Sequence, residues 1–384
     1  MKKTLLATAI AGALGVSAAA QAATVYSQDG TEVDVYGRVV MALTSGGVED
    51  TTFTTNEDGE QVRRAKSSGS EINDLGSRLG FRARHEVNTD LSVFANMEFR
   101  FDASSRNADP ITNNRQTFLG VESQQFGRFW VGNFNSIYYN AVGSVFDVPE
   151  NAGWSNFGSV DNSSHGNALA YSTPVLEGFQ AHVQVKHYSG NDEVQGDGDN
   201  SSTTSSQAAV SYTWQDLYVA AGYDQNRDYS RVGRGHTAGD GPGDSLANAG
   251  RHSDEGLWGL AASYQFTPAF SGRIGYETSS SNDSRLEETA GSFQYLGRDI
   301  FSVGGTFDYG MGEIYGQYAR VSWDDNEATG SISSSNQWML GANYRFSQPM
   351  YAFAEVYDAD FDRDDAISDL NDDLLYTVGV RYDF

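Results

Sequence analysis

Charged residues recur at alternate positions inside short apolar stretches of this chain. Four arginines fall in three of the first four stretches expected to form strands: Arg38, Arg78, Arg82 and Arg115. Successive side chains of a strand point to opposite faces, and we place all four arginines on the polar faces of their strands. Guanidinium groups gathered on one surface attract anions and orient passing dipoles. We therefore expect a basic wall on the inner side of the fold.

Carboxylates that could oppose this wall lie in a long segment, 135–165, that shows no clear periodicity. About thirty residues of this kind inside a compact fold usually form a functional loop. If the loop folds inward, Asp147 and Glu150 face the arginines across a narrow gap and create a transverse field. The alternative is that the arginines balance other inward carboxylates in a polar lining, namely Glu98, Asp34 and Asp102. The two interpretations are compatible.

Histidine and serine offer little catalytic chemistry. The best pair for an enzyme is His187 with Ser189, on the apolar side of an expected strand. A nucleophilic hydroxyl needs an oriented base and an oxyanion donor, and the sequence has neither a G-x-S-x-G turn nor a partner for this histidine. The other histidines show no metal-ligand spacing, and the chain has no cysteine. We predict no catalytic residue, no metal and no cofactor.

The elements that must position the charged groups are short segments of strict alternation. In 373–384, one parity is apolar and the other largely polar, and 91–102 alternates still more clearly. Aromatic rings two residues apart end five such segments, directly before a turn or the chain end: Tyr212 and Trp214, Tyr264 and Phe266, Phe307 and Tyr309, Tyr344 and Phe346, Tyr382 and Phe384. Rings at a common height on many strands are typical of a barrel at a lipid–water boundary.

Sixteen strands are expected, with short turns alternating with long acidic loops. We place them at 31–44, 75–87, 91–102, 114–122, 128–134, 166–175, 178–189, 206–215, 216–226, 255–266, 269–279, 298–309, 312–324, 336–346, 350–360 and 373–384. This organisation predicts an all-β fold, an antiparallel transmembrane barrel. Side chains cannot fill a ring of this size, so we expect an aqueous channel. Arg320 shares its parity with apolar residues, which predicts either snorkelling to the headgroups or a bulge.

The amino terminus indicates export. Residues 1–22 have two lysines, an apolar run and a final Ala-Gln-Ala, which predicts a cleaved signal peptide and one mature domain, 23–384. The run is shorter than the ~20 residues that a spanning helix needs, and no second run exists. A mature chain in a membrane would therefore cross it as a closed barrel, which pairs every backbone polar group.

The charge of the chain argues against nucleic acid as a partner. Removing Lys2 and Lys3 from the 25 basic residues leaves 23 against 51 acidic ones, a net charge of −28. The mean hydropathy of −0.48 is compatible with a barrel, because only alternate strand residues meet lipid. The acidic loops are mostly solvated, but they could also draw cations to the channel mouth and bind lipopolysaccharide through divalent bridges.

Several motifs resemble those of the general diffusion porins of the Gram-negative outer membrane. They are VDVYGR at 33–38, SRLGF at 77–81, NRQTFLG at 114–120 and the terminal Phe384, and the resemblance covers the whole length. It implies a sixteen-stranded homotrimer with its third extracellular loop folded into the pore. It also implies passage of ions and small hydrophilic solutes, and an assembly machinery that recognises Phe384.

Matching the family's motifs residue by residue assigns roles to the charged groups. Arg38, Arg78, Arg82 and Arg115 match the family's pore arginines, Asp147 and Glu150 its third-loop acidic pair, and Glu98 its lumen glutamate. The chain departs from the pattern at Ser163-Ser164-His165, where many relatives carry another arginine, and at Asn151-Ala152-Gly153, where they often carry Phe-Gly-Gly. A thinner basic wall and the net charge predict a preference for cations.

Three other functions stay open at this level. A sugar or nucleoside channel would line its path with aromatic rings, for which Tyr36, Phe94 and Tyr218 are candidates. An outer-membrane enzyme would need the unsupported histidine–serine pair. An adhesin or phage receptor would use the long loops, and this role could coexist with a pore.

Overall fold

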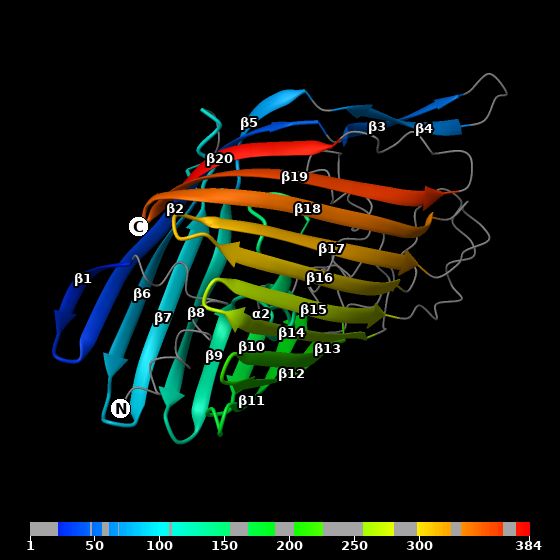
Figure 1. Ribbon diagram of the computed structural model, residues 1–384. Helices are drawn as coiled ribbons and strands as arrows, with labels where there is room; N and C mark the ends of the chain where they lie inside the picture. Colours follow the sequence, from blue (N-terminus) through cyan, green and yellow to red (C-terminus); the bar gives the residue numbers. More distant parts are fainter. Residues whose placement is uncertain are drawn as a thin grey trace.

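The computed structural model describes most of the chain apart from its amino terminus and parts of the long loops. The described ranges are 22–46, 48–55, 61–67, 69–106, 110–153, 168–188, 203–225, 256–279, 298–323, 332–363 and 374–384. The expected signal peptide lies outside these ranges except for its last residue. Within them the regular structure is almost entirely antiparallel strand, and Figure 1 shows the strands side by side in one tilted ring.

The barrel consists of sixteen strands, as the sequence predicts. Two short strands, β5 (Ser70–Asp74) and β6 (Arg78–Glu86), pair with the two halves of β2 (Thr31–Ser45) and together make one barrel strand. The others are β7 (Leu91–Arg100), β8 (Asn113–Ser123), β9 (Gly127–Asn133), β10 (Ala168–Ser172), β11 (Phe179–Tyr188), β12 (Thr203–Trp214), β13 (Leu217–Asp224), β14 (Leu257–Thr267), β15 (Phe270–Ser279), β16 (Arg298–Asp308), β17 (Glu313–Trp323), β18 (Ile332–Ser347), β19 (Met350–Arg363) and β20 (Leu375–Asp383).

The ring closes where β20 pairs with β2. Phe384 exchanges two backbone hydrogen bonds with Gly37, at 2.7 and 3.0 Å. Beyond this point β2 pairs with β1 (Ala23–Gln28) instead of β20, beginning with Ala23 opposite Val35. β1 therefore extends β20 along the same edge of β2. The turn between β1 and β2 uses Asp29 and Gly30 with φ of 50° and 72°, which suits a tight hairpin. β1 was not expected from the sequence.

A second difference lies in the polar loop expected up to residue 73. Here β3 (Val48–Thr55) and β4 (Gln61–Ser67) form a separate two-stranded hairpin outside the ring, followed by β5. Because β5 belongs to the barrel, the second barrel strand begins earlier than expected. It is interrupted at 75–77, between β5 and β6. The interruption is held by Asp74, whose carboxylate accepts hydrogen bonds from the backbone N–H groups of Gly76 and Ser77 at 2.7 Å each.

The two faces of the strands differ as predicted. Along β20 the residues alternate strictly, with Val378, Val380 and Tyr382 exposed outside and Thr377, Arg381 and Asp383 buried inside. Of the ten rings in the five aromatic strand ends described above, nine lie exposed on the outer face and Phe384 is half-buried. An apolar outside and a polar inside are what a barrel needs in lipid.

Arg320 lies on the outer face near the end of β17. The pairings of β17 with β16 and β18 contain no register shift, so the structure has no bulge at this position. Its guanidinium donates to Asn336 at 2.9 Å and to Ser334 at 3.3 Å, both close to the end of the barrel that carries the long loops. Of the two predicted explanations, the geometry therefore agrees with snorkelling.

In the described part of the chain, one segment enters the barrel. After β9 the chain forms α2 (Ile137–Ala141) and η1 (Gly143–Phe146), and it runs along the inner wall as far as residue 153. We call residues 134–153 the inward loop. Ser136 caps α2, since its hydroxyl accepts a hydrogen bond from the Tyr139 N–H at 2.9 Å. Among the described residues, no helix is long and apolar enough to span a membrane.

Closure at Gly37 generates a first prediction. A Cβ at Gly37 would lie 2.5 Å from the Phe384 ring and 2.7 Å from the Arg78 carbonyl oxygen. Overpacking of this kind typically costs ~1–3 kcal/mol. We expect Gly37→Ala to lower the temperature at which the folded barrel loses its compact electrophoretic mobility. Gly69→Ala is the control, because a Cβ there would meet nothing within 4 Å. Equal melting of the two variants would contradict the closure role.

Candidate functional site

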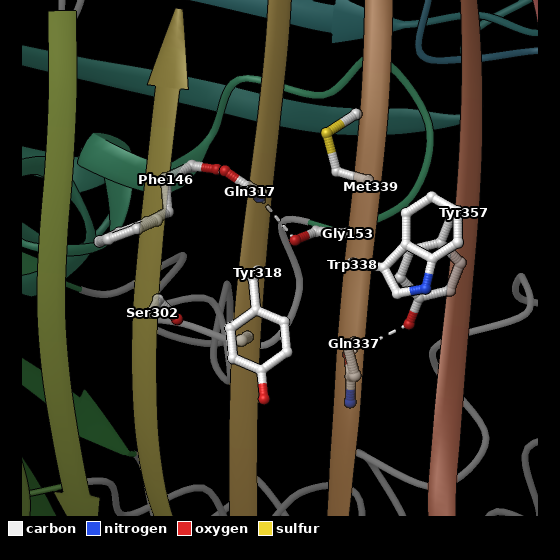
Figure 2. Close-up of a pocket in the computed structure, with 10 residues that line it drawn as sticks. Phe146, Gly153, Ser302, Gln317, Tyr318, Gln337, Trp338, Met339 and Tyr357 are labelled. Carbon is white, nitrogen blue, oxygen red and sulfur yellow. Dashed lines mark hydrogen bonds between the residues drawn. The ribbon is translucent and has the colours of Figure 1, made fainter.

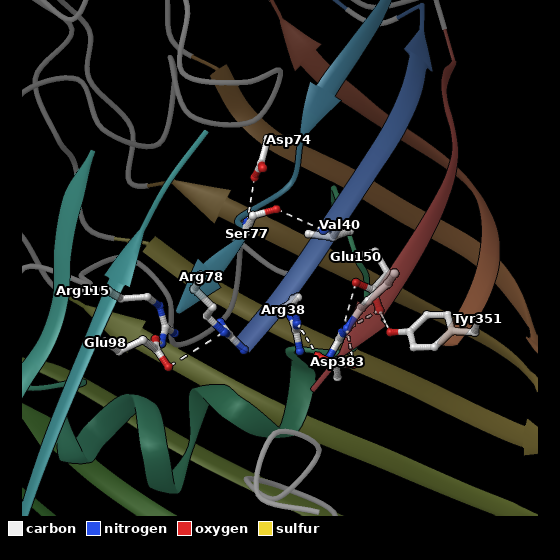
Figure 3. Close-up of polar contacts among 11 residues, drawn as sticks. Arg38, Val40, Asp74, Ser77, Arg78, Glu98, Arg115, Glu150, Tyr351 and Asp383 are labelled. Carbon is white, nitrogen blue, oxygen red and sulfur yellow. Dashed lines mark hydrogen bonds and ion pairs between the residues drawn. The ribbon is translucent and has the colours of Figure 1, made fainter. Parts of the chain in front are cut away.

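The four arginines expected to form a basic wall come together inside the barrel. Arg38 lies on β2, Arg78 and Arg82 on β6, and Arg115 on β8. Arg38 pairs across the strands with Arg78, and Arg78 pairs in turn with Arg100 of β7, which was not assigned to the site from the sequence. Figure 3 shows Arg38, Arg78 and Arg115 pointing to the same space.

Arg115 reaches the lumen by a route that simple alternation does not give. It has the parity of Leu119, which is exposed on the outer face. A register shift in the β7–β8 pairing lies between the partners of Glu98 and Phe99, which leaves Arg115 as an extra residue between Gln116 and Asn114. A bulge of this kind redirects a side chain, and here it turns Arg115 inward to Glu98. Arg115 therefore lies in the lumen because of the bulge and not because of the alternation of the strand.

Carboxylates lie among these arginines, but of the three in the polar-lining interpretation only Glu98 pairs with them among the described residues, while Asp34 accepts from Thr24 and Asp102 from Ser104. Glu98 accepts a hydrogen bond from Arg115 and lies 3.9 Å from the Nε of Arg78. Arg38 forms an ion pair with Asp383 of β20 at 2.9 Å. Arg82 has no ion pair in the described part of the chain, and its guanidinium lies 4.2 Å from the ring centroid of Tyr36. The wall is thus basic but partly neutralised by Glu98 and Asp383.

Side chains of the opposite wall hold the backbone of the inward loop. The N–H groups of Ile137 and Tyr138 donate to Gln184 of β11 and Gln207 of β12, at 2.9 and 3.2 Å. Gln317 of β17 donates to the carbonyl oxygens of Phe146 and Gly153, at 3.2 and 2.6 Å. Because buried backbone groups need partners, these amides fix the path of the loop.

The far end of the loop is held by charged groups of β19 and β20. The backbone N–H groups of Glu150 and Asn151 donate to the two carboxylate oxygens of Glu355, at 2.7 and 3.0 Å. The Glu150 carboxylate accepts a hydrogen bond from Tyr351 and pairs with Arg381 at 3.0 Å. Figure 3 shows Glu150 and Tyr351 beside Asp383, and Asp383 also pairs with Arg381 at 2.8 Å. The Glu150 side chain is therefore bound to β19 and β20, the part of the wall against which the end of the loop lies.

Asp147 occupies a different position from Glu150. It is exposed, directly after η1, and within the described residues it forms a hydrogen bond to Tyr139 but no ion pair. Burial raises the pKa of Tyr139 well above its ordinary value and Asp147 adds to the rise, while the charges of Arg115 and Arg78 oppose it. The phenol thus stays protonated and donates to Asp147. The charges of Arg115 and Arg78 can oppose the rise of the Tyr139 pKa only if the two arginines lie near Tyr139. This part of the loop therefore faces the basic wall.

A small cavity lies behind the inward loop. Figure 2 shows it between the end of the inward loop and strands β16 to β19, with Phe146, Gly153 and Gln317 at its edge. Gly153 has a φ of 106°, and a Cβ there would lie 2.8 Å from Met339. The Asn151-Ala152-Gly153 step therefore ends in a glycine that the backbone requires.

Four further residues of the site were not assigned from the sequence: Arg100, Arg381, Tyr351 and Glu355. Arg381 lies on the polar parity of the last strand, which was a usable signal. Ser163, Ser164 and His165 lie outside the described residues. Across the described part of the chain, no group of three or more histidine, aspartate or glutamate side chains could hold a metal ion.

The class of protein follows from this architecture. A closed barrel of sixteen strands has a water-filled interior, and a loop with fixed charges narrows it. The fold is that of a channel rather than an enzyme. A family model described as Gram-negative porin matches residues 7–240 and 229–384, and the chain belongs to that family. It is an outer-membrane protein that forms a pore for passive diffusion.

Known proteins of similar sequence cover the whole chain. It is 26% identical over 417 residues to a monosaccharide porin of Halomonas sp, with 100% of each chain covered. It is 25% identical over 395 residues to outer membrane porin F of Escherichia coli strain K12, again with 100% of each covered. Among solved structures, the trimer form of OmpT, an outer membrane protein of Vibrio cholerae, has a TM-score of 0.60 at 17% identity and covers 93% of this chain and 100% of that one.

The Glu355 contacts generate a second prediction. Glu355→Ala would leave the N–H groups of Glu150 and Asn151 without their acceptor, at a cost of ~1–3 kcal/mol for each buried group. We expect the loop end to detach, so single-channel recordings should show a larger and noisier open current. Glu122→Ala is the control, because it removes an exposed ion pair with Arg84 away from the loop. A quiet, unchanged current in Glu355→Ala would show that this contact does not hold the loop.

Proposed function

We propose that the pore is a general diffusion channel that prefers cations. The observation that carries this is Asp147, an exposed carboxylate without an ion pair among the described residues, on the part of the loop that faces the basic wall. The arginines of that wall are partly neutralised by Glu98 and Asp383. With a net charge of −26 for the whole sequence, cations are favoured on the approach to the waist and not rejected there.

The charged groups of the waist have separate roles in this proposal. Arg38, Arg78, Arg82 and Arg115 supply the positive side of a transverse field, and Glu98 holds two of them in place. Asp147 supplies the negative side. Glu150 secures the loop through Arg381 rather than acting on solutes directly. A field across the waist orients dipolar solutes, so small polar molecules pass and larger apolar ones are disfavoured.

A sugar-specific channel is the second candidate, because one relative is named a monosaccharide porin. The inward aromatic rings argue against it. Tyr36 is buried and donates to Asn96 at 3.0 Å, and Tyr218 donates to the Ala141 carbonyl oxygen at 2.8 Å. Phe94 packs edge-on against Phe118, with ring centroids 6.3 Å apart. Rings engaged in this way do not form an open ladder for a sugar.

We also propose a homotrimer in the outer membrane. The solved relative from Vibrio cholerae is described as a trimer form. The five aromatic-x-aromatic strand ends described above lie between residues 212 and 384, whereas Phe99 and Phe101 lie at the end of β7 and the β8–β9 turn carries exposed Phe126. An aromatic belt marks a lipid boundary, so its smaller number of rings on β2 to β9 agrees with contact to a neighbouring copy there. The same surface includes exposed Leu119, Val121 and Val131.

The remaining proposals concern maturation and the cell surface. We infer cleavage after Ala22 and one mature domain, 23–384. Phe384 would act as the assembly signal, and it stacks on Tyr382 with centroids 5.9 Å apart beside the closing pair. The acidic loops that would bind lipopolysaccharide through divalent ions, or serve as a receptor, lie largely outside the described residues. We propose no catalytic activity.

Planar-bilayer recording of the purified protein tests pore and trimer together. We expect each insertion to give three equal conductance steps and a current that grows linearly with salt concentration. Single steps would contradict the trimer but not the pore. Saturating block of the current by monosaccharides would instead favour the sugar-specific channel.

Asp147 generates a selectivity prediction. In a salt gradient, we expect the reversal potential of the wild-type channel to show a preference for cations. Asp147→Asn should move it towards zero, because it removes the unpaired carboxylate of the waist. Glu122→Gln is the control, since this lumen carboxylate pairs with Arg84 away from the loop. An anion preference in the wild type would refute the proposal.

A further inference from the structure

The inner wall opposite the arginines carries an apolar patch among its polar residues, which is unusual for a water-filled barrel. The buried residues of this patch are small or aliphatic and come from β12, β13, β14, β16 and β17: Ala209, Ala220, Leu257, Ala261, Ile300, Ala319 and Val321. Contact between such an apolar surface and water is unfavourable, so another part of the protein is expected to cover it. We call this surface the seat.

The inward loop is what covers the seat. Five of its residues belong to the same buried cluster: Tyr138, Ala141, Val142, Val145 and Phe146. Tyr138, Val142 and Phe146 are each at most 1% exposed. α2 and η1 therefore present an apolar side to the wall, while Tyr139 and Asp147, each next to a seated residue, turn towards the arginines.

Two glycines of the seat form a notch for Tyr138. A Cβ at Gly259 of β14 would lie 2.0 Å from the Tyr138 hydroxyl oxygen, and one at Gly222 of β13 would lie 2.8 Å from its ring. Neither glycine has a positive φ, so both are needed for space rather than for backbone freedom. The Tyr138 hydroxyl donates to Glu277 of β15 at 2.9 Å, and Glu277 is 0% exposed.

We propose that Tyr138 is the positioning residue of the waist and that the glycine notch sets how far the acidic side of the loop reaches into the channel. This rests on the proposed function, because it concerns the same constriction. Tyr139 follows Tyr138 directly, and Asp147 follows the seated Val145 and Phe146. A packed interface has discrete arrangements rather than a continuous range. The depth at which Tyr138 is seated therefore fixes the positions of Tyr139 and Asp147. Apolar contacts are not screened by salt, and the reach of the loop therefore stays constant as ionic strength changes.

The test is a double-substitution cycle read by single-channel conductance and reversal potential. In Gly259→Ala the new methyl collides with the Tyr138 hydroxyl, pushes the loop into the channel and lowers conductance by about 1.5-fold. Tyr138→Phe removes the closest colliding atom but leaves the ring carbon at 2.8 Å and Val142 at 2.9 Å, so the double variant Gly259→Ala with Tyr138→Phe should regain part of the conductance of Tyr138→Phe alone. Gly305→Ala is the control for adding a methyl to the barrel, because its nearest neighbours would lie at an ordinary 3.4 Å.

Heat-modifiable electrophoretic mobility checks that each variant is folded before it is recorded. If Gly259→Ala conducts like the wild type, or if it loses as much conductance in the Tyr138→Phe background as in the wild type, the positioning role is wrong. Failure of the proposed function would show differently, as a wild-type channel without cation preference. A folded Gly259→Ala channel with lower conductance, partly rescued by Tyr138→Phe, would establish the notch.

Discussion

The structure depends on one constraint: in lipid, every backbone N–H and C=O of a spanning segment must find a partner within the protein. Sixteen strands meet it only if the ring closes, and the pairing of β20 with β2 closes it. The last residue takes part, since Phe384 and Gly37 exchange both of their hydrogen bonds. β1 then pairs the part of β2 that β20 leaves open. Closure fixes the register of all strands, and with it which side chains face water.

Closure also explains why the loop lies inside. A ring of this size leaves a lumen that strand side chains cannot fill, and a segment placed there must pair its own polar groups. The wall supplies amides for this purpose, Gln184, Gln207 and Gln317, at the heights where the loop backbone passes. Between them it supplies the apolar seat. Polar and apolar contacts are thus interleaved along one path, so the loop has one position that satisfies both.

Much of the fold could be predicted because its signal is local. The period-two alternation of β7 and β20 and the aromatic strand ends need no knowledge of distant residues. The missing pieces depend on distant contacts. Arg115 faces the lumen through a bulge that only the register with β7 shows. Glu150 meets Arg381 and Glu355, more than 200 residues further along the chain. The choice between a bulge and snorkelling at Arg320 likewise required the registers of both neighbouring strands.

The distribution of ion pairs separates the charges that hold the waist from those that act on solutes. Arg38, Arg78 and Arg115 each have a carboxylate within 3.9 Å, and Glu150 has Arg381. Opposite charges in close contact cancel part of their field at a distance, so these pairs hold the shape of the waist as well as contributing to its field. Arg82 and Asp147 differ, because neither has an ion pair in the described part of the chain. Arg100 likewise has no ion pair among the described residues, and Arg78 and Arg115 share one carboxylate, that of Glu98. A solute in the waist therefore experiences a net positive wall on one side and the unpaired Asp147 on the other. Their separation is set by how deeply the loop is seated.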